Sequence, residues 1–220
     1  MIKLNLGCGS LRPNGWINTD SSLNANIQKI PLLGKSISKL INPIEYDNSN
    51  MIYMNLNKKW KYKNETVDIV YASHLFEHLS LQSTKLFLEE AFRTLKPGGI
   101  IRIVVPDLYK IAKKYINEYE NEDTLDPTEY IMWAINMNRE GQYGDVSFLK
   151  GILLELQGYP HQHKYMYDEK SLKHRLQKFG FVDIESLVYG NSKYIESITD
   201  VEGKSESYLS IYIEAKKPNL

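Results

Sequence analysis

The chain has 220 residues, of which 42% are hydrophobic and 25% charged, and its 27 basic residues balance its 27 acidic ones. This length is typical of one domain, so we expect residues 1–220 to form a single one. The balanced charge argues against a surface for nucleic acid or anionic membranes. A single cysteine excludes an internal disulfide and any metal cage built from cysteines. Because no signal-peptide layout and no membrane-length apolar run is found, we expect a cytoplasmic protein without membrane insertion.

The first half of the chain alternates short strands with helices. Apolar runs predict four strands, at residues 2–6, 16–19, 51–56 and 67–72. Between the second and third runs, the polar residues 21–50 carry at most one weak helix, near 34–40. An apolar stripe with helical spacing predicts the next helix, and it comprises Leu88, Ala91, Phe92 and Leu95. We expect Lys96-Pro97-Gly98-Gly99 to end this helix and residues 100–105 to form a strand buried on both faces.

Helices dominate the second half. The clearest helical stripe runs from Leu108 to Tyr119, and we expect Asp107 to cap this helix and its tyrosines to pack in a core or lid. The pattern predicts further helices at about 128–138, 145–157 and 171–179. Two last strands, at residues 181–188 and 208–215, have no helix between them. They predict an antiparallel hairpin.

Alternating strands and helices predict an α/β fold with a mostly parallel sheet, helices on both faces and a C-terminal antiparallel hairpin. Ligands of such sheets bind beyond the carboxyl ends of the strands. The candidate binding residues are therefore those that follow each strand: 7–10, 20, 55–57, 73–78 and 106–107. We expect residues 107–165 to form a helical insertion or lid that makes the substrate site.

Two glycines follow the first strand, in Gly7-Cys8-Gly9-Ser10. Glycine there lets the backbone turn sharply and touch a ligand directly. A dinucleotide fingerprint would need a third glycine at position 12, where Arg12 stands, and an acidic residue about 20 positions on, whereas Asp20 is only 13 beyond Gly7. The loop also lacks the lysine of a phosphate loop. This pattern disfavours a nicotinamide or nucleotide-sugar enzyme and favours a nucleoside without a pyrophosphate.

Four segments in this order resemble the landmarks of class I S-adenosylmethionine-dependent methyltransferases of the small-molecule branch: Asn5–Gly9, Gly15–Asp20, Asp68–Leu79 and Leu95–Gly99. The likeness is greatest to a bacterial subgroup often associated with cell-surface glycan genes. It continues to the C-terminus, where His163–Asp168, Gly180–Phe181 and Glu214–Pro218 also resemble the family. The resemblance implies a Rossmann-like fold, S-adenosylmethionine as cofactor, and methyl transfer to a small-molecule or saccharide acceptor.

The resemblance also implies which residues bind the cofactor. Asp20 would accept hydrogen bonds from both ribose hydroxyls, and Asn55 would meet the adenine amino group with its side-chain carbonyl. The glycine loop would lie under the methionine part, Leu56 would pack on the adenine ring, and Ser73 and His74 would lie beside the sulfonium. The implied cofactor-binding set is Gly7, Cys8, Gly9, Asp20, Asn55, Leu56, Ser73 and His74.

Three positions depart from the family pattern. Asn5 and Asn55 stand where acidic residues are common, and Ser10 stands where a third glycine is common. An amide oxygen at Asn55 still accepts the hydrogen bond that the role requires. Because Asn5 replaces an acidic residue, the resemblance does not assign the residue that contacts the amino group of the cofactor.

An oxygen or nitrogen acceptor must lose a proton when it is methylated. Histidine is suited to this task because its side chain titrates near neutral pH. His74 is the first candidate for the catalytic base. His163 and His161 are the second candidates, if residues 120–165 fold over the site as a lid.

The same sequence also allows other functions. His74–His78 matches H-x-x-E-H, a zinc-peptidase pattern, but it straddles a strand end and no downstream glutamate ligand is identifiable. His161 and His163 lack an evident third ligand, so no metal is expected. Cys8 as a nucleophile has no base placed near it. A non-catalytic scaffold or binding protein of the same fold remains the main alternative function.

Overall fold

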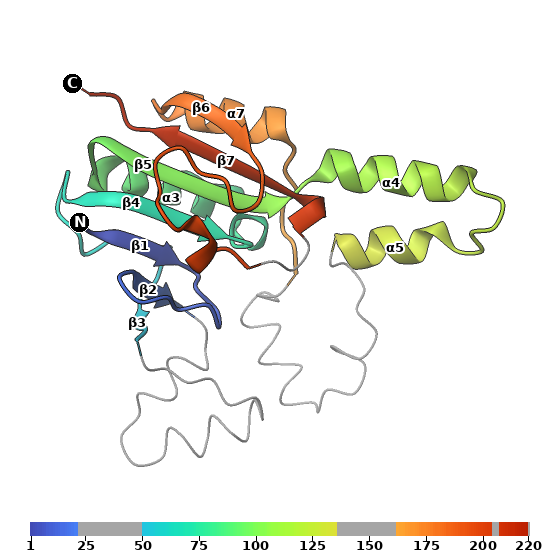
Figure 1. Ribbon diagram of the computed structural model, residues 1–220, viewed down its shortest axis with the longest axis horizontal. Coiled ribbons are helices and arrows are strands. Elements are labelled where there is room, and N and C mark those ends of the chain that lie inside the picture. Colours follow the sequence, from blue (N-terminus) through green and yellow to red (C-terminus); the bar gives the residue numbers. More distant parts are fainter. Residues whose placement is uncertain (22–49, 136–161, 204–206, 220) are drawn as a thin grey trace, which may run out of the picture.

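The computed structural model describes residues 1–21, 50–135, 162–203 and 207–219. Its centre is a seven-stranded sheet in the order β3-β2-β1-β4-β5-β7-β6 (Figure 1). Strands β1 to β5 run parallel, and β7 runs antiparallel to both β5 and β6. The strands are β1 Lys3–Leu6, β2 Ile17–Asp20, β3 Ile52–Tyr53, β4 Val67–Ser73, β5 Leu95–Pro106, β6 Val182–Leu187 and β7 Ser210–Lys216. The mostly parallel α/β fold with its C-terminal hairpin is confirmed.

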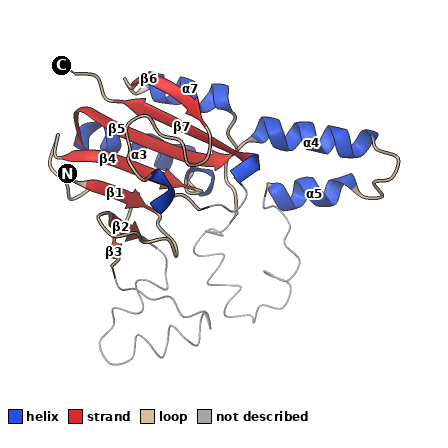
Figure 2. Ribbon diagram, in the orientation of Figure 1, coloured by secondary structure: helices blue, strands red, loops and turns tan. Residues whose placement is uncertain are grey.

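Figure 2 shows the helices of the described residues, and each α-helix among them begins at a residue whose side chain caps it. Asp107 accepts hydrogen bonds from the amides of Tyr109 and Lys110, as expected, and Asp168 forms a capping box with Ser171. None of the described helices combines the length and apolar character that a membrane span requires. The helical elements are η1 Phe76–His78, α3 Leu81–Thr94, α4 Leu108–Glu120, α5 Pro127–Ala134, α7 Glu169–Lys178, η2 Ile198–Asp200 and η3 Ser207–Leu209.

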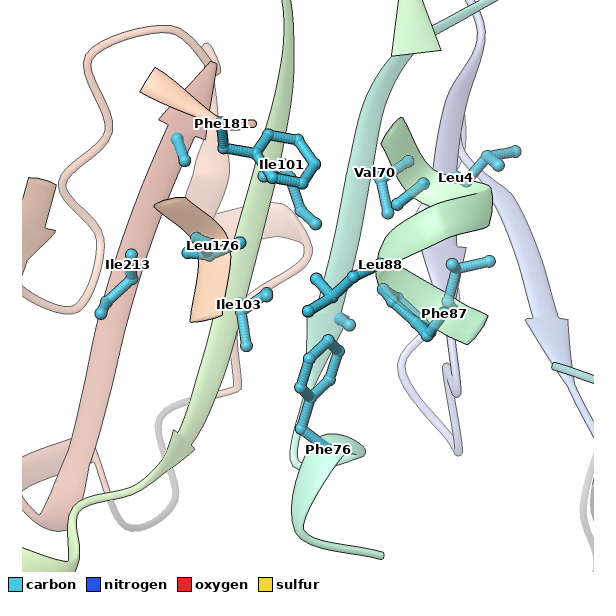
Figure 3. Close-up of a cluster of buried hydrophobic side chains, with 14 of the residues drawn as sticks. Leu4, Val70, Phe76, Phe87, Leu88, Ile101, Ile103, Leu176, Phe181 and Ile213 are labelled. Carbon is cyan, nitrogen blue, oxygen red and sulfur yellow. The ribbon is translucent and has the colours of Figure 1, made fainter. Parts of the chain in front are cut away.

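The main core lies between one face of the sheet and the helices α3 and α7 (Figure 3). Alternate residues of β4 and β5 point to this face, because side chains along a strand alternate between its two sides. Phe87 of α3 is fully buried and meets Phe76 and Trp60 edge to face, with ring centroids 4.7 and 5.2 Å apart. This packing fixes η1, which directly follows the carboxyl end of β4.

Within the described residues, the second face is covered by the connection 188–203 and its single-turn helix η2. Ile195, Ile198 and Val201 of this connection pack on the sheet, and Trp16 meets Tyr71 at a centroid distance of 6.0 Å. The helix expected near 34–40 and the helix at 145–157 lie outside the described residues.

Three local expectations need correction. The third strand is much shorter than 51–56 and comprises only Ile52–Tyr53. Strand β5 begins at Leu95, because Leu95 pairs with Val67 before the register shifts, so the Lys-Pro-Gly-Gly segment lies within the strand. Of the stripe on α4, only Ile111 is buried, and Tyr119 is 71% exposed. The reason is that α4 and α5 pair with each other and extend away from the sheet (Figure 1).

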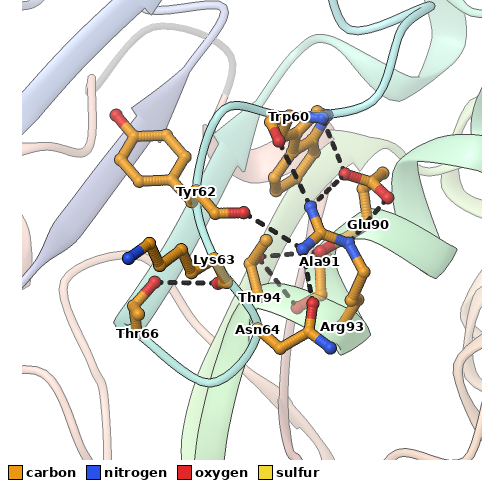
Figure 4. Close-up of polar contacts among 9 residues, drawn as sticks. All are labelled: Trp60, Tyr62, Lys63, Asn64, Thr66, Glu90, Ala91, Arg93 and Thr94. Carbon is orange, nitrogen blue, oxygen red and sulfur yellow. Dashed lines mark hydrogen bonds and ion pairs between the residues drawn. The ribbon is translucent and has the colours of Figure 1, made fainter.

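A bidentate ion pair ties α3 to the segment before β4 (Figure 4). Glu90 is 6% exposed, and its two oxygens accept from Arg93 Nε at 2.9 Å and Arg93 Nη2 at 2.6 Å. Glu90 Oε2 also accepts from the Trp60 amide at 2.7 Å, and Arg93 donates to the carbonyl of Tyr62 and the side chain of Asn64. Arg93 first, and then the Trp60 amide, lower the pKa of Glu90 below its ordinary value of 4.5.

We expect Glu90→Gln to reduce the free energy of unfolding by about 1–3 kcal/mol at pH 7, because a charge-assisted pair becomes a poorly matched amide contact. A lowered folded pKa makes this stabilisation complete above pH 4.5, and it is lost as the pH falls through the folded value. Urea unfolding at pH 7 and pH 3 measures both effects. The difference between the two proteins should shrink at pH 3, and a constant difference would contradict the assignment. Glu89→Gln, an exposed change on the same helix, is the control.

Candidate functional site

The sheet register brings the carboxyl ends of three strands to one edge. Leu6 of β1 is level with Thr19 of β2 and with Ala72 of β4. The residues that follow therefore lie together: Gly7, Asp20 and Ser73. Because the strands are parallel, this edge is where ligands bind in open α/β sheets. The structure thus brings together the three chain segments that carry most of the expected site residues.

The glycine loop has a backbone that other residues rarely adopt. Gly7 and Gly9 have φ angles of +68° and +51°. A Cβ atom at Gly7 would lie 3.0 Å from the Leu75 side chain, whereas a Cβ at Gly9 would meet no atom within 4 Å. Gly7 is therefore required by its conformation and by the close approach of Leu75. At Gly9 the space beyond the Cα is open, while its amide donates to Asp20 and its carbonyl accepts from Arg12.

Asp20 lies at the end of β2, facing this loop. One of its carboxylate oxygens accepts a hydrogen bond from the Gly9 amide at 3.1 Å. A carboxylate has about four acceptor positions, so this bond occupies only part of its capacity. The contact joins the carboxylate to the glycine loop. The residue expected at the ribose is thus in direct contact with the loop expected under the methionine part.

Sequence reasoning missed how the glycine loop is held. The Asn5 amide, only 3% exposed, donates to the Leu11 carbonyl at 2.9 Å and to the side chain of Asn18 at 3.0 Å. Asn18 in turn donates to the Pro13 carbonyl. Asn5 therefore braces the loop from below. The signal for this role was the pair of asparagines at equivalent places in two adjacent strands.

His74 has an unusual backbone for its residue type. It directly follows β4, and its φ is +48°, in the left-handed region. Its Nδ1 lies 3.3 Å from Glu77 Oε1, and its Nε2 lies 3.2 Å from Ser210 Oγ. The side chain remains 34% exposed. Strained residues held by their surroundings are common at functional sites, so this geometry supports a functional role for the ring.

The remaining expected cofactor residues are placed as follows. Ser73 ends β4 and is half-buried beside His74. The Asn55 side-chain oxygen accepts from the Asn57 amide at 2.9 Å, which uses one of its two lone pairs. Leu56 is buried in the main core, so little of its surface is available to a ligand.

Cys8 is a structural residue of the loop. Its amide donates to the Thr19 carbonyl at 2.9 Å, and its side chain is buried. Burial first, and then the nearby Asp20, raise the pKa of the Cys8 thiol to about 11. The thiol therefore stays protonated at neutral pH, and this disfavours a nucleophilic role.

The histidines of the H-x-x-E-H segment do not share a helix. His74 follows β4, whereas Glu77 and His78 lie on the short helix η1. Two metal ligands four residues apart on one helix, the arrangement of a zinc peptidase, are therefore absent from this segment. His163 lies beside His78, with ring centroids 5.0 Å apart. His161 lies outside the described residues.

The expected lid is described only in part. Helix α4 begins at the end of β5, where the Leu108 amide donates to the Tyr167 carbonyl at 2.8 Å, and α5 returns beside it (Figure 1). Residues 136–161 lie outside the described residues. A substrate site formed by residues 107–165 stays a prediction.

Comparison with known proteins identifies the family. A family model described as a methyltransferase domain matches residues 10–186. The chain belongs to this methyltransferase family. The resemblance to class I S-adenosylmethionine-dependent methyltransferases is thereby confirmed, and the cofactor of this methyltransferase is S-adenosylmethionine. Among curated proteins, none matches the chain.

One solved structure, with a TM-score of 0.50, shares the fold of this methyltransferase, and two others are similar to it. An S-adenosylmethionine-dependent methyltransferase from Methanosarcina mazei is 16% identical, with a TM-score of 0.50, over 99% of this chain and 92% of that one. Another, from Archaeoglobus fulgidus, is 17% identical, with a TM-score of 0.48, over 98% and 86%. The CurJ carbon methyltransferase is 14% identical, with a TM-score of 0.47, over 99% of this chain and 48% of that one. The chain thus spans about half the length of the CurJ structure. Identities this low show the fold alone.

Proposed function

We propose that this methyltransferase transfers the methyl group of S-adenosylmethionine to a hydroxyl or amine of a small-molecule or saccharide acceptor. The observation that carries the proposal is the direct contact of Asp20 with the Gly9 amide, at the sheet edge where β4 also ends. The residues fit the cofactor: the open space beside Gly9 can accommodate its methionine part, and the Asp20 carboxylate suits the ribose hydroxyls.

When bound, the cofactor supplies a methyl group that its sulfonium has already activated. The chain then has to align the acceptor with the methyl carbon and exclude water, and alignment of this kind is worth up to about 7–11 kcal/mol. His74 would remove the acceptor proton. The Glu77 carboxylate, 3.3 Å from His74 Nδ1, favours a proton on Nδ1 and leaves Nε2 as the acceptor of the proton.

Asp20→Ala tests the cofactor site. Losing a hydrogen-bonded carboxylate costs about 1.5–3 kcal/mol, so we expect the affinity for S-adenosylhomocysteine to fall about 10- to 150-fold. Isothermal titration calorimetry measures this change. Asp200→Ala, an exposed change on η2 of the opposite face, should bind as the parent does. Equal affinity in the Asp20 variant would reject the ribose role. Failure of the parent chain to bind S-adenosylhomocysteine would instead favour the non-catalytic scaffold.

A further inference from the structure

Three metal-ligating side chains gather on the far side of His74. Glu77, His78 and His163 each offer one ligand atom, and these atoms lie within 4.8 Å of one another. The first two belong to η1, and the third comes from the segment before α7. Two imidazoles and one carboxylate are the donor set of many zinc and iron sites.

The environment of Glu77 favours binding of a cation, because its carboxylate is buried and has no hydrogen bond. Glu77 is 1% exposed, and neither carboxylate oxygen accepts a hydrogen bond. The His74 ring is close by, with its Nδ1 3.3 Å from Oε1. A buried carboxylate without hydrogen bonds is costly unless a positive charge compensates it. The structure therefore keeps an expensive anion in place beside two histidines.

The backbone holds the three side chains together. The Glu77 carbonyl accepts from the amides of Lys164 and Tyr165, at 2.6 and 3.2 Å, so the segment that carries His163 is fixed against η1. The His78 Nδ1 lies 3.2 Å from the Gln162 carbonyl. A carbonyl partner requires the proton to be on Nδ1, which leaves the lone pair of Nε2 for a metal. Metal-binding histidines are oriented by this same kind of contact.

We propose that Glu77, His78 and His163 form a binding site for a divalent first-row transition cation, with Zn²⁺ as the representative ion. Imidazole nitrogen favours Zn²⁺ and its neighbours over Mg²⁺ and Ca²⁺, which prefer oxygen ligands. With metal–ligand bonds of about 2.0–2.2 Å, ligand atoms lie about 3–4 Å apart, so the three side chains close in by about an ångström on binding. Three protein ligands leave coordination positions open for a further molecule.

The role of the cation rests on the proposed function. Glu77 contacts His74 through Nδ1, so the site borders that side of the ring, and its open coordination positions suit an acceptor hydroxyl. Binding to a divalent cation lowers the pKa of a hydroxyl. The acceptor class implied is a hydroxyl compound with a neighbouring oxygen, such as a sugar.

Direct metal binding tests the site without any assay of activity. The full chain is freed of metal with a chelator and titrated with Zn²⁺ in a calorimeter, and Co²⁺ is added separately to follow its visible absorption. We expect one ion per chain. His163→Ala and Glu77→Gln should each weaken Zn²⁺ binding by about a hundredfold or more, since changes next to ligands already cost 10- to 100-fold. Circular dichroism verifies that each variant is folded.

His174→Ala is the matched control, because His174 is exposed on α7 and belongs to no such cluster. It should bind Zn²⁺ as the parent does. Unchanged affinity in a folded His163→Ala or Glu77→Gln protein, or no stoichiometric binding by the parent, would overturn the metal site. S-adenosylhomocysteine is titrated into the same samples. If the parent chain binds S-adenosylhomocysteine but not Zn²⁺, only the metal site is rejected. If it binds Zn²⁺ but not S-adenosylhomocysteine, only the proposed function is rejected.

Discussion

Arg102→Met is expected to reduce the free energy of unfolding by about 3–5 kcal/mol, because it leaves two buried carboxylates without their cation. Arg102 is fully buried on the second face of the sheet. Its Nε donates to Glu202 at 2.6 Å and its Nη1 donates to Glu214 at 2.9 Å. Urea unfolding followed by circular dichroism measures the loss.

The same network attaches the connection 188–203 to the sheet. Glu214 is opposite Arg102 in the β5–β7 register, whereas Glu202 comes from the connection and also accepts from the Gly190 amide at 2.8 Å. Burial raises the pKa of Glu202 even though Arg102 opposes that shift. Removing the arginine therefore leaves an anion that is already costly, and the connection should detach first.

A second variant separates charge from packing. Changing Glu202 and Glu214 to glutamine together with Arg102→Met removes all three charges, and it should recover much of the lost stability. Lys193→Met breaks an exposed pair with Glu185 on the same face, and it should change little. A single Arg102→Met protein as stable as the parent would show that the buried network does not hold this connection.

His74→Ala is expected to lower kcat by about 10²- to 10⁴-fold while the affinity for S-adenosylhomocysteine changes little, because general base catalysis contributes an effect of that size. His74→Asn is the companion change, since asparagine tolerates the left-handed backbone at this position without offering a base. Turnover is measured as release of S-adenosylhomocysteine from S-adenosylmethionine in the presence of monosaccharide acceptors.

The two His74 variants distinguish a chemical role from a structural one. A residue that only supports the fold would lose stability and cofactor affinity together with turnover. His174→Ala, on the exposed face of α7, should retain full turnover. If His74→Asn kept the kcat of the parent, another group would have to remove the acceptor proton, and His74 would not be the base.

The glycine loop and Asp20 could be predicted because their signals are local. A strand ends where its apolar run ends, and parallel strands present those ends at one edge. The exposed stripe of α4 was not predictable in the same way. Periodicity shows that a helix has an apolar face, but it does not show what covers that face. The pairing of α4 with α5 away from the sheet depends on how the whole chain packs.

By itself, the sequence determined the sheet class and the residues at the ends of β1, β2 and β4, since each follows from spacing within a few residues. Only the tertiary structure decided which distant groups meet. Arg102 lies in an otherwise apolar run, and its partners come 100 and 112 residues later. His163 reaches Glu77 and His78 in the same way. Buried charges and metal ligands are paired by long-range packing, and sequence spacing carries no information about such pairs.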